Sequence, residues 1–205
     1  FVPMSILFLN SLAVIIYVNS DITILGMFES DSVVGVYSFS SKIYNILKQL
    51  VNAVIVVAVP RLVVTLVSDV QRYRKYLEDI FNLLILILLP ISAGLFMLSK
   101  SIILIVGGRE YLVGESVLRL LSFSIIFALI SSIYTNCMLI IGREEKKILI
   151  GTSISAIFNI VGNLILIPYI GMIGAALTTV LAEFLNMLVQ RYYSKKYVLS
   201  HNLAS

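Results

Sequence analysis

Six apolar segments, each close to the length that a bilayer requires, constrain the fold of this 205-residue chain more than any other feature. A helix needs about 20 predominantly apolar residues to cross the hydrocarbon core of a membrane. The chain is 60% hydrophobic and 13% charged, a composition that a water-soluble domain does not tolerate on its surface. We therefore predict an all-α, polytopic membrane helix bundle. The expected spans are approximately 2–25, 33–60, 80–98, 117–141, 148–167 and 173–189.

The connections between these spans are short, which predicts one transmembrane unit over residues 1–191 and a polar tail over residues 192–205. The longest connection, residues 62–79, is expected to be a basic loop. The apolar piece Ile102–Val106 is too short to cross a membrane and ends at two glycines, so it predicts an interfacial or re-entrant turn. Because the first residue is Phe1, we expect the chain to be part of a longer protein.

Lysine and arginine alternate along the chain in a way that predicts its orientation, because cytoplasmic segments of membrane proteins are enriched in both. Ten cations fall at alternate ends of the spans: Arg61, Arg72, Arg74, Lys75, Arg143, Lys146, Lys147, Arg191, Lys195 and Lys196. The opposite ends hold only Lys100, Arg109 and Arg119. Both ends of the segment are therefore expected in the cytoplasm. The net charge of +4 then reflects topology and does not indicate a nucleic-acid partner.

The second span carries a polar stripe within an otherwise apolar helix. At about 100° per residue, seven polar side chains fall within about 120° of arc. They are Ser38, Ser41, Lys42, Asn45, Lys48, Gln49 and Asn52. A lysine at the centre of a spanning helix costs about 2.5–3.5 kcal/mol, so it requires a partner or a wet cavity. The clustering of the stripe favours the lining of a cavity.

Two alternatives for the stripe remain open. The Lys42 side chain can extend to the outer head groups, whereas Lys48 lies too near the middle of the span to do so. The amides and serines can also join neighbouring helices through hydrogen bonds without lining a cavity.

Two carboxylates and one arginine are further candidates. Glu183, in the middle of the sixth span, is a candidate for proton or cation coupling, with a protonated form, a paired form or a structural hydrogen bond as alternatives. It shares a helical face with Thr179, Asn186 and Gln190. Asp21 is either a solvated residue near the outer end of the first span or a second ion-coupling candidate. Arg119 can face a cavity or the outer head groups.

The sequence offers little for metal or nucleophilic chemistry. Its one cysteine, Cys137, lies in an apolar run, and its one histidine, His201, lies in the predicted tail. We therefore expect no metal, no cofactor and no Ser-His-Asp centre.

Small residues are frequent in the last two spans and predict close helix packing. They are Gly151, Ser155, Gly162, Gly171, Gly174, Ala175 and Ala176.

Several segments together carry a family resemblance. They are DITILGMFESDSVVGVYSFSSKI from Asp21, VPRL from Val59, GGREYLVGESVLRLL from Gly107, IGREEKK from Ile141 and NIVGNLILIPYIGMIGAALTTVLAE from Asn159. In this order and spacing they cover nearly all of residues 21–183. They resemble the carboxyl-terminal half of bacterial polysaccharide and O-antigen flippases, in the multidrug, oligosaccharidyl-lipid and polysaccharide exporter superfamily.

The resemblance implies a transporter of two six-helix lobes around a central cavity, of which this chain is the second. It implies the translocation of undecaprenyl-pyrophosphate-linked oligosaccharide repeat units across the bacterial cytoplasmic membrane. The implied cycle is alternating access driven by an ion gradient, and the product serves surface polysaccharide biosynthesis. The expected partners are this lipid-linked oligosaccharide, membrane lipids, the missing first lobe, and the polymerase and chain-length machinery.

The residues of the stripe suit such a substrate. Lys42 and Lys48 are the expected contacts to pyrophosphate or acidic sugars, with Arg119 as a further lining candidate. The amides of Asn45, Gln49 and Asn52 are the expected contacts to sugar hydroxyls.

Three other functions remain open: a drug or metabolite antiporter of the same superfamily, a lipid II flippase, and a membrane polysaccharide polymerase or glycosyltransferase. A cationic lining argues against cationic drugs. An enzyme would need paired acids or a basic catalytic group on a loop, whereas the longest connection here is a basic cytoplasmic one. We therefore expect a transporter that is not an enzyme.

Overall fold

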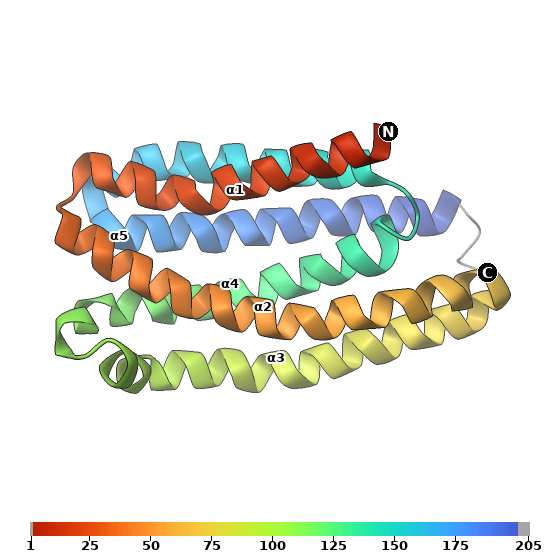
Figure 1. The fold of residues 1–205 in the computed structure, drawn as a ribbon, viewed down its shortest axis with the longest axis horizontal. Coiled ribbons are helices and arrows are strands. Elements are labelled where there is room, and N and C mark those ends of the chain that lie inside the picture. The colour runs from red at the N-terminus through yellow and green to blue at the C-terminus, as the bar shows by residue number, and fades with distance from the viewer. Residues whose placement is uncertain (1, 201–205) are drawn as a thin grey trace.

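The computed structural model describes the backbone of residues 2–200 and the side chains of residues 4–195. Five long helices run side by side along one axis (Figure 1): α1 Val2–Phe28, α2 Asp31–Ser68, α3 Val70–Val106, α4 Glu115–Ile133 and α5 Glu145–Ser200. Two short elements complete the chain, the 3-10 helix η1 Arg109–Gly114 and the π-helix η2 Tyr134–Leu139. Within the part of the chain that the structure describes, five helical segments are long and apolar enough to cross a membrane. The prediction of a multi-pass membrane helix bundle is therefore confirmed.

Helix α5 consists of two arms that lie side by side, residues 145–170 and 172–200 (Figure 1). The chain reverses at Gly171, whose φ of 54° and ψ of −136° are not helical. The positive φ favours glycine here, and the space beside its Cα is occupied by the end of the Glu29 side chain. Each arm is longer than the about 20 residues that a membrane crossing needs.

The two arms of α5 approach each other closely through small residues. A Cβ atom on Gly162 would lie 2.8 Å from Thr178 Cγ2 of the second arm. Ala175 and Ala176 are completely buried. The predicted close packing of small residues is confirmed here.

The helices are longer than the predicted spans, and the predicted loop over residues 62–79 is wrong. Helix α2 continues to Ser68 and α3 begins at Val70, so Asp69 alone separates them. The Asp69 carboxylate accepts hydrogen bonds from the backbone N–H groups of Gln71 and Arg72, which caps α3.

The predicted interfacial turn at Ile102–Val106 is also wrong, because these residues form the last turns of α3. Ile103 is completely buried in the core. At the other end of the chain, α5 continues to Ser200 and so includes the first residues of the predicted tail, whereas His201 lies outside the described residues.

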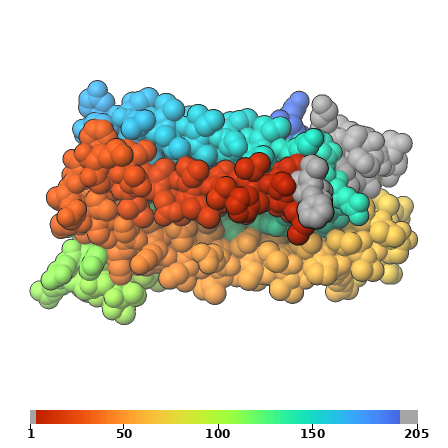
Figure 2. All heavy atoms as spheres, turned by 45° about the horizontal axis from the view of Figure 1, so that its top comes forward, coloured from red at the N-terminus to blue at the C-terminus, as the bar shows by residue number. Residues whose placement is uncertain are grey.

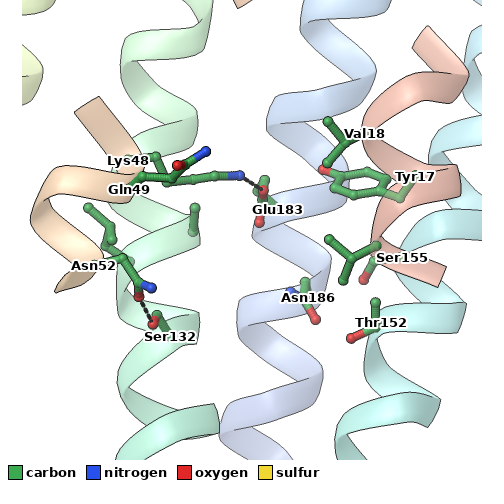
Figure 3. Close-up of a pocket in the computed structure, with 13 residues that line it drawn as sticks. Tyr17, Val18, Lys48, Gln49, Asn52, Ser132, Thr152, Ser155, Glu183 and Asn186 are labelled. Atoms are coloured by element: carbon green, nitrogen blue, oxygen red, sulfur yellow. Dashed lines mark hydrogen bonds and ion pairs between the residues drawn. The ribbon is translucent and has the colours of Figure 1, made fainter. Parts of the chain in front are cut away.

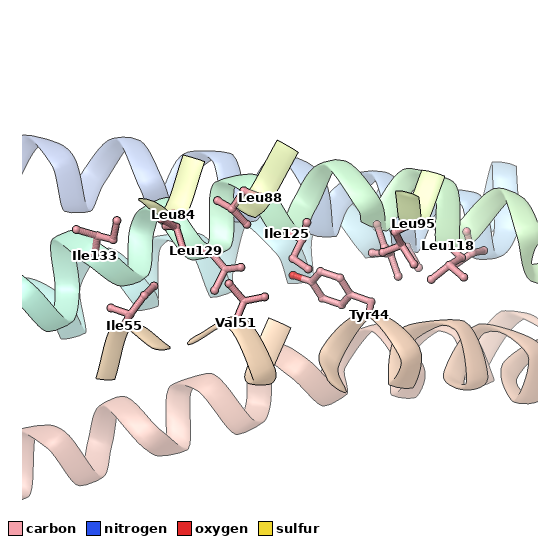
Figure 4. Packing of buried hydrophobic residues seen from close by; sticks show 14 of the residues in the cluster. Tyr44, Val51, Ile55, Leu84, Leu88, Leu95, Leu118, Ile125, Leu129 and Ile133 are labelled. Atoms are coloured by element: carbon pink, nitrogen blue, oxygen red, sulfur yellow. The ribbon is translucent and has the colours of Figure 1, made fainter. Parts of the chain in front are cut away.

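Helix α4 lies at the centre of the bundle. Ten of its 19 residues are buried, against eight of the 38 residues of α2. Its inward side chains pack against α2 and α3 (Figure 4). The labelled members of this core are Tyr44, Val51 and Ile55 of α2, Leu84, Leu88 and Leu95 of α3, and Leu118, Ile125, Leu129 and Ile133 of α4.

The π-helix η2 follows α4, and a hydrogen bond from a side chain of α3 stabilises it. The Tyr73 hydroxyl donates a hydrogen bond of 2.7 Å to the backbone carbonyl of Cys137. Such π-turns hold one residue more than an α-turn and occur frequently beside functional sites.

The basic segments gather at one end of the bundle. The junction of α2 and α3, the turn between η2 and α5, and the last turns of α5 lie together there with the start of α1 (Figure 1). The opposite end holds the α1–α2 connection, η1 and the turn between the two arms of α5 (Figure 1). The alternation of cations in the sequence therefore corresponds to two physical ends of the molecule.

Candidate functional site

A pocket of about 230 Å³, with polar side chains set in a largely apolar lining, lies between α1, α2, α4 and both arms of α5. We call it the central pocket, and Figure 2 shows the surface hollowed between α1 and α2. Its polar wall (Figure 3) is formed by Tyr17 of α1, Lys48, Gln49 and Asn52 of α2, Ser132 of α4, Thr152 and Ser155 of the first arm, and Glu183 and Asn186 of the second. Since Lys48 lies near the middle of α2, the pocket lies near the middle of the bundle.

Lys48 and Glu183 form an ion pair on the wall of the central pocket, with 3.2 Å between Lys48 Nζ and Glu183 Oε1. The Lys48 side chain is 23% exposed, whereas the Glu183 side chain is 7% exposed. The Lys48 ammonium also lies 5.0 Å from the centre of the Tyr44 ring. The lysine is therefore paired, yet part of it still borders the pocket.

Hydroxyl and amide groups continue the polar wall. Ser132 Oγ donates a short hydrogen bond to Asn52 Oδ1, and Asn136 Nδ2 donates to Ser132 Oγ at 2.8 Å. The Tyr17 hydroxyl and Ser155 Oγ are buried and have no hydrogen-bond partner among the described residues. Buried polar atoms normally have a partner, so these two groups are unsatisfied donors beside the pocket.

A second cluster of polar side chains is centred on Asp21, which is 6% exposed. Asp21 Oδ2 accepts hydrogen bonds from the Tyr37 hydroxyl at 2.8 Å and from Thr179 Oγ1 at 2.6 Å. Asp21 Oδ1 accepts a hydrogen bond of 2.6 Å from Asn163 Nδ2. The carboxylate thus joins α1 to α2 and to both arms of α5. The alternative that Asp21 is a solvated residue near the end of its span is wrong.

The asparagines of the first arm extend the Asp21 cluster. Asn163 Nδ2 also donates to Asn159 Oδ1 at 3.0 Å, and Ser20 Oγ donates to the same oxygen at 3.0 Å. The Thr178 hydroxyl donates to Asn163 Oδ1. These asparagines were not predicted as site residues from the sequence. Their four-residue spacing within an apolar run is the signal that could have identified them.

The structure brings most of the predicted site residues together. Lys48, Gln49, Asn52 and Glu183 line the central pocket. A smaller adjoining cavity is lined by Asn45 and Asp21 and shares Lys48 and Glu183 with the central pocket. The two predicted coupling carboxylates are therefore neighbours in space, although 162 positions separate them in the sequence.

Lys42 and Arg119 lie outside both cavities. Lys42 is exposed on α2 and lines neither one. Arg119 forms an ion pair with Glu115 of its own helix, with 2.6 Å between Arg119 Nη2 and Glu115 Oε1. Its guanidinium also lies 5.6 Å from the centre of the Phe96 ring.

The side chains at these cavities can bind an anion and hydroxyl groups. One ammonium, several amides and several hydroxyls border the open space. Among the described residues, no group of three or more His, Cys, Asp or Glu side chains is arranged to hold a metal ion.

Residues 4–116 match a protein family described as polysaccharide biosynthesis protein. The chain belongs to this family. The matched region includes both Asp21 and Lys48.

Two curated proteins are similar to this chain. The chain is 34% identical over 131 residues, 60% of its length, to the uncharacterized membrane protein MJ1068 of Methanocaldococcus jannaschii. It is 25% identical over 185 residues, 87% of its length, to the probable low-salt glycan biosynthesis flippase Agl15 of Haloferax volcanii. The matches cover 25% and 38% of these relatives, so the chain spans well under half of their lengths. No solved structure matches the chain.

Proposed function

We propose that this chain forms one lobe of a flippase that moves a lipid-linked oligosaccharide across the cytoplasmic membrane. The observation that carries the proposal is the lysine Lys48, which borders a polar pocket in the middle of a membrane helix bundle. The polysaccharide biosynthesis family and the similarity to a probable glycan biosynthesis flippase support the same function.

The chemistry of the pocket fits a polyprenyl-pyrophosphate oligosaccharide. Lys48 supplies a cation for the pyrophosphate, and the amides of Asn45, Gln49 and Asn52 can bond to sugar hydroxyls. The polyprenyl tail stays in the surrounding lipid. Lys42 and Arg119 would meet the substrate outside the two cavities, on surfaces that a second lobe can face.

The proposed topology has six crossings, with each arm of α5 counted as one. Six is an even number, so both ends of the segment lie on the same side of the membrane. The excess of lysine and arginine at that end of the bundle supports a cytoplasmic location. The greater length of the relatives supports a second lobe in the complete transporter.

Asp21 and Glu183 are the proposed ion-coupling residues for an alternating-access cycle. Both are buried carboxylates beside the same cavity, and their occupation by a proton or a cation changes the net charge of that cavity. A purely structural role for either carboxylate is the competing hypothesis.

A lipid II flippase would use the same cationic pocket, and a polysaccharide polymerase or glycosyltransferase is the competing enzyme. The family description favours a polysaccharide over a peptidoglycan precursor. The Lys48–Glu183 ion pair favours a transporter over an enzyme, because a carboxylate held by an ammonium is a poor general base.

The proposed function is tested with Lys48→Ala in a strain whose own copy of the gene is deleted. Loss of a hydrogen bond to a charged group is worth about 1.5–3 kcal/mol, or roughly 10- to 150-fold in affinity. We therefore expect at least about a 10-fold loss of surface glycan, with lipid-linked oligosaccharide accumulating on the cytoplasmic leaflet. Lys100 is an exposed lysine in α3, so Lys100→Ala is the matched control and should leave the glycan unchanged. Normal glycan in a well-expressed Lys48→Ala strain would refute the proposal.

A further inference from the structure

We propose that Glu183 is an internal competitor for Lys48, so that the central pocket accepts only ligands whose anionic group displaces this carboxylate. The displaced Glu183 then accepts a hydrogen bond from the Tyr17 hydroxyl. The inference rests on the proposed function and names the residue that selects the substrate by its charge.

The Lys48 ammonium, which is the cation of the central pocket, is already paired with the Glu183 carboxylate. Glu183 Oε1 lies 3.2 Å from Lys48 Nζ, so a ligand reaches the ammonium only in competition with a carboxylate. A sugar hydroxyl carries no charge and cannot replace a carboxylate at an ammonium. A pyrophosphate brings more negative charge and more acceptor oxygens than Glu183, and therefore competes successfully.

A Glu183 carboxylate that has been displaced from Lys48 needs a new hydrogen-bond donor. The Glu183 side chain is 7% exposed, so the loss of Lys48 would leave a buried, unpaired charge. The Asp21 carboxylate lines the cavity that adjoins the central pocket, and it would repel the unpaired Glu183 carboxylate. Glu183 therefore remains in place without Lys48 only if another donor can reach it.

The Tyr17 hydroxyl, on the wall of the central pocket, is such a donor. The Tyr17 hydroxyl is buried and has no hydrogen-bond partner among the described residues. Figure 3 shows Glu183 between Lys48 on one side and Tyr17 on the other, with the Tyr17 hydroxyl on the side of the ring that faces Glu183. A rotation of the Glu183 side chain exchanges one partner for the other.

The exchange also changes which helices are joined. The Lys48–Glu183 pair links α2 to the second arm of α5, whereas a Tyr17–Glu183 hydrogen bond links α1 to that arm. An anion at Lys48 would thus remove this one link between α2 and α5 when the pocket is filled, while the Asp21 cluster still connects the two helices.

The test is the binding of inorganic pyrophosphate to the purified protein in lipid nanodiscs, measured by titration calorimetry. If the ion pair occupies Lys48 at least about 90% of the time, Glu183→Gln should tighten binding about 10-fold, since affinity scales with the competent fraction. Glu183→Asp, which keeps the charge on a shorter side chain, should tighten it by less. Glu110→Gln, an exposed glutamate of η1, is the matched control and should have no effect. Unchanged or weaker binding by Glu183→Gln would overturn the competitor role.

Tyr17→Phe tests the exchange. It should weaken pyrophosphate binding about 5-fold in the wild-type background and have no effect in the Glu183→Gln background, because only a displaced carboxylate needs the hydroxyl. Tyr169→Phe, at a highly exposed tyrosine, is its control. Equal effects of Tyr17→Phe in both backgrounds would overturn the exchange.

A spectroscopic measurement covers the case in which Glu183→Gln does not fold. In the wild-type protein, pyrophosphate should shift an infrared carboxylate band that Glu183→Asp moves and Glu110→Gln does not. An unshifted band in a protein that binds pyrophosphate would overturn the displacement. If the wild-type protein binds pyrophosphate and Glu183→Gln binds no more tightly, only this inference fails. If no variant binds pyrophosphate and Lys48→Ala leaves surface glycan intact, the proposed function fails with it.

Discussion

Removal of the Asp21 carboxylate should destabilise the protein far more than removal of one polar group from a helix surface. In the Asp21→Ala variant the hydroxyls of Tyr37 and Thr179 and the amide of Asn163 lose their common acceptor. Hydrogen bonds between membrane helices average about 0.6 kcal/mol and reach about 1.7 kcal/mol. Three of them at a buried carboxylate therefore predict a loss of about 2–5 kcal/mol in the free energy of unfolding.

The assay is reversible unfolding of the purified protein by steric trapping or by titration with a denaturing detergent. Thr179→Val removes one of the three hydrogen bonds and should cost about 0.6–1.7 kcal/mol. Thr23→Val is the matched control, because the exposed Thr23 hydroxyl donates only to the carbonyl of Asn19 in its own helix. It should change the free energy of unfolding by less than about 0.5 kcal/mol.

A double-mutant cycle decides whether the hydrogen bonds act through Asp21. In the Asp21→Ala background, Thr179→Val should add almost nothing, because its acceptor is already absent. A loss below about 1 kcal/mol for Asp21→Ala, or the same cost of Thr179→Val in both backgrounds, would refute the role of Asp21 as a common acceptor.

Two further predictions concern packing, and both are measured as changes in the free energy of unfolding by the same assay. Gly162→Ala should destabilise the protein by about 1–3 kcal/mol, because its Cβ would press on Thr178 Cγ2, whereas Gly94→Ala has no heavy atom within 4 Å and should not destabilise it. A neutral Gly162→Ala would contradict the close approach of the two arms. Leu129→Ala should cost about 2–5 kcal/mol because Leu129 is buried in the core, and Leu86→Ala, at a leucine that is 72% exposed, should cost far less. Equal costs for the two leucines would contradict the placement of α4 at the centre of the bundle.

The apolar segments were sufficient to predict a helical membrane protein, because hydrocarbon leaves a spanning chain few alternatives to the helix. The ends of the helices could not be predicted in the same way. Residues 62–79 are polar enough for a loop, yet Asp69 caps α3 and the Arg61 guanidinium donates to the Tyr76 hydroxyl at 2.6 Å. Ile102–Val106 is helical because Ile103 packs into a core that no local pattern reveals.

The candidate site was predicted as separate residues and not as contacts. Lys48 and Glu183 were each identified by the cost of a charge in hydrocarbon, but 135 positions separate them and nothing in either segment specifies the pair. The helical projection placed Lys42 on the same stripe as Lys48, although only Lys48 borders the pocket. A projection gives the face of a helix and does not show which neighbouring helix covers each turn of it.

The π-helix η2 can tolerate the deletion of one residue, whereas the regular helix α4 cannot. A turn of this kind already contains one residue more than an α-helix needs, so the deletion of one residue within 134–139 can be absorbed by rewinding. A deletion earlier in α4 would instead rotate every later side chain by about 100° and turn Ser132 away from Asn52. A single-residue deletion in this helix is therefore least harmful within η2, where the helix is already irregular.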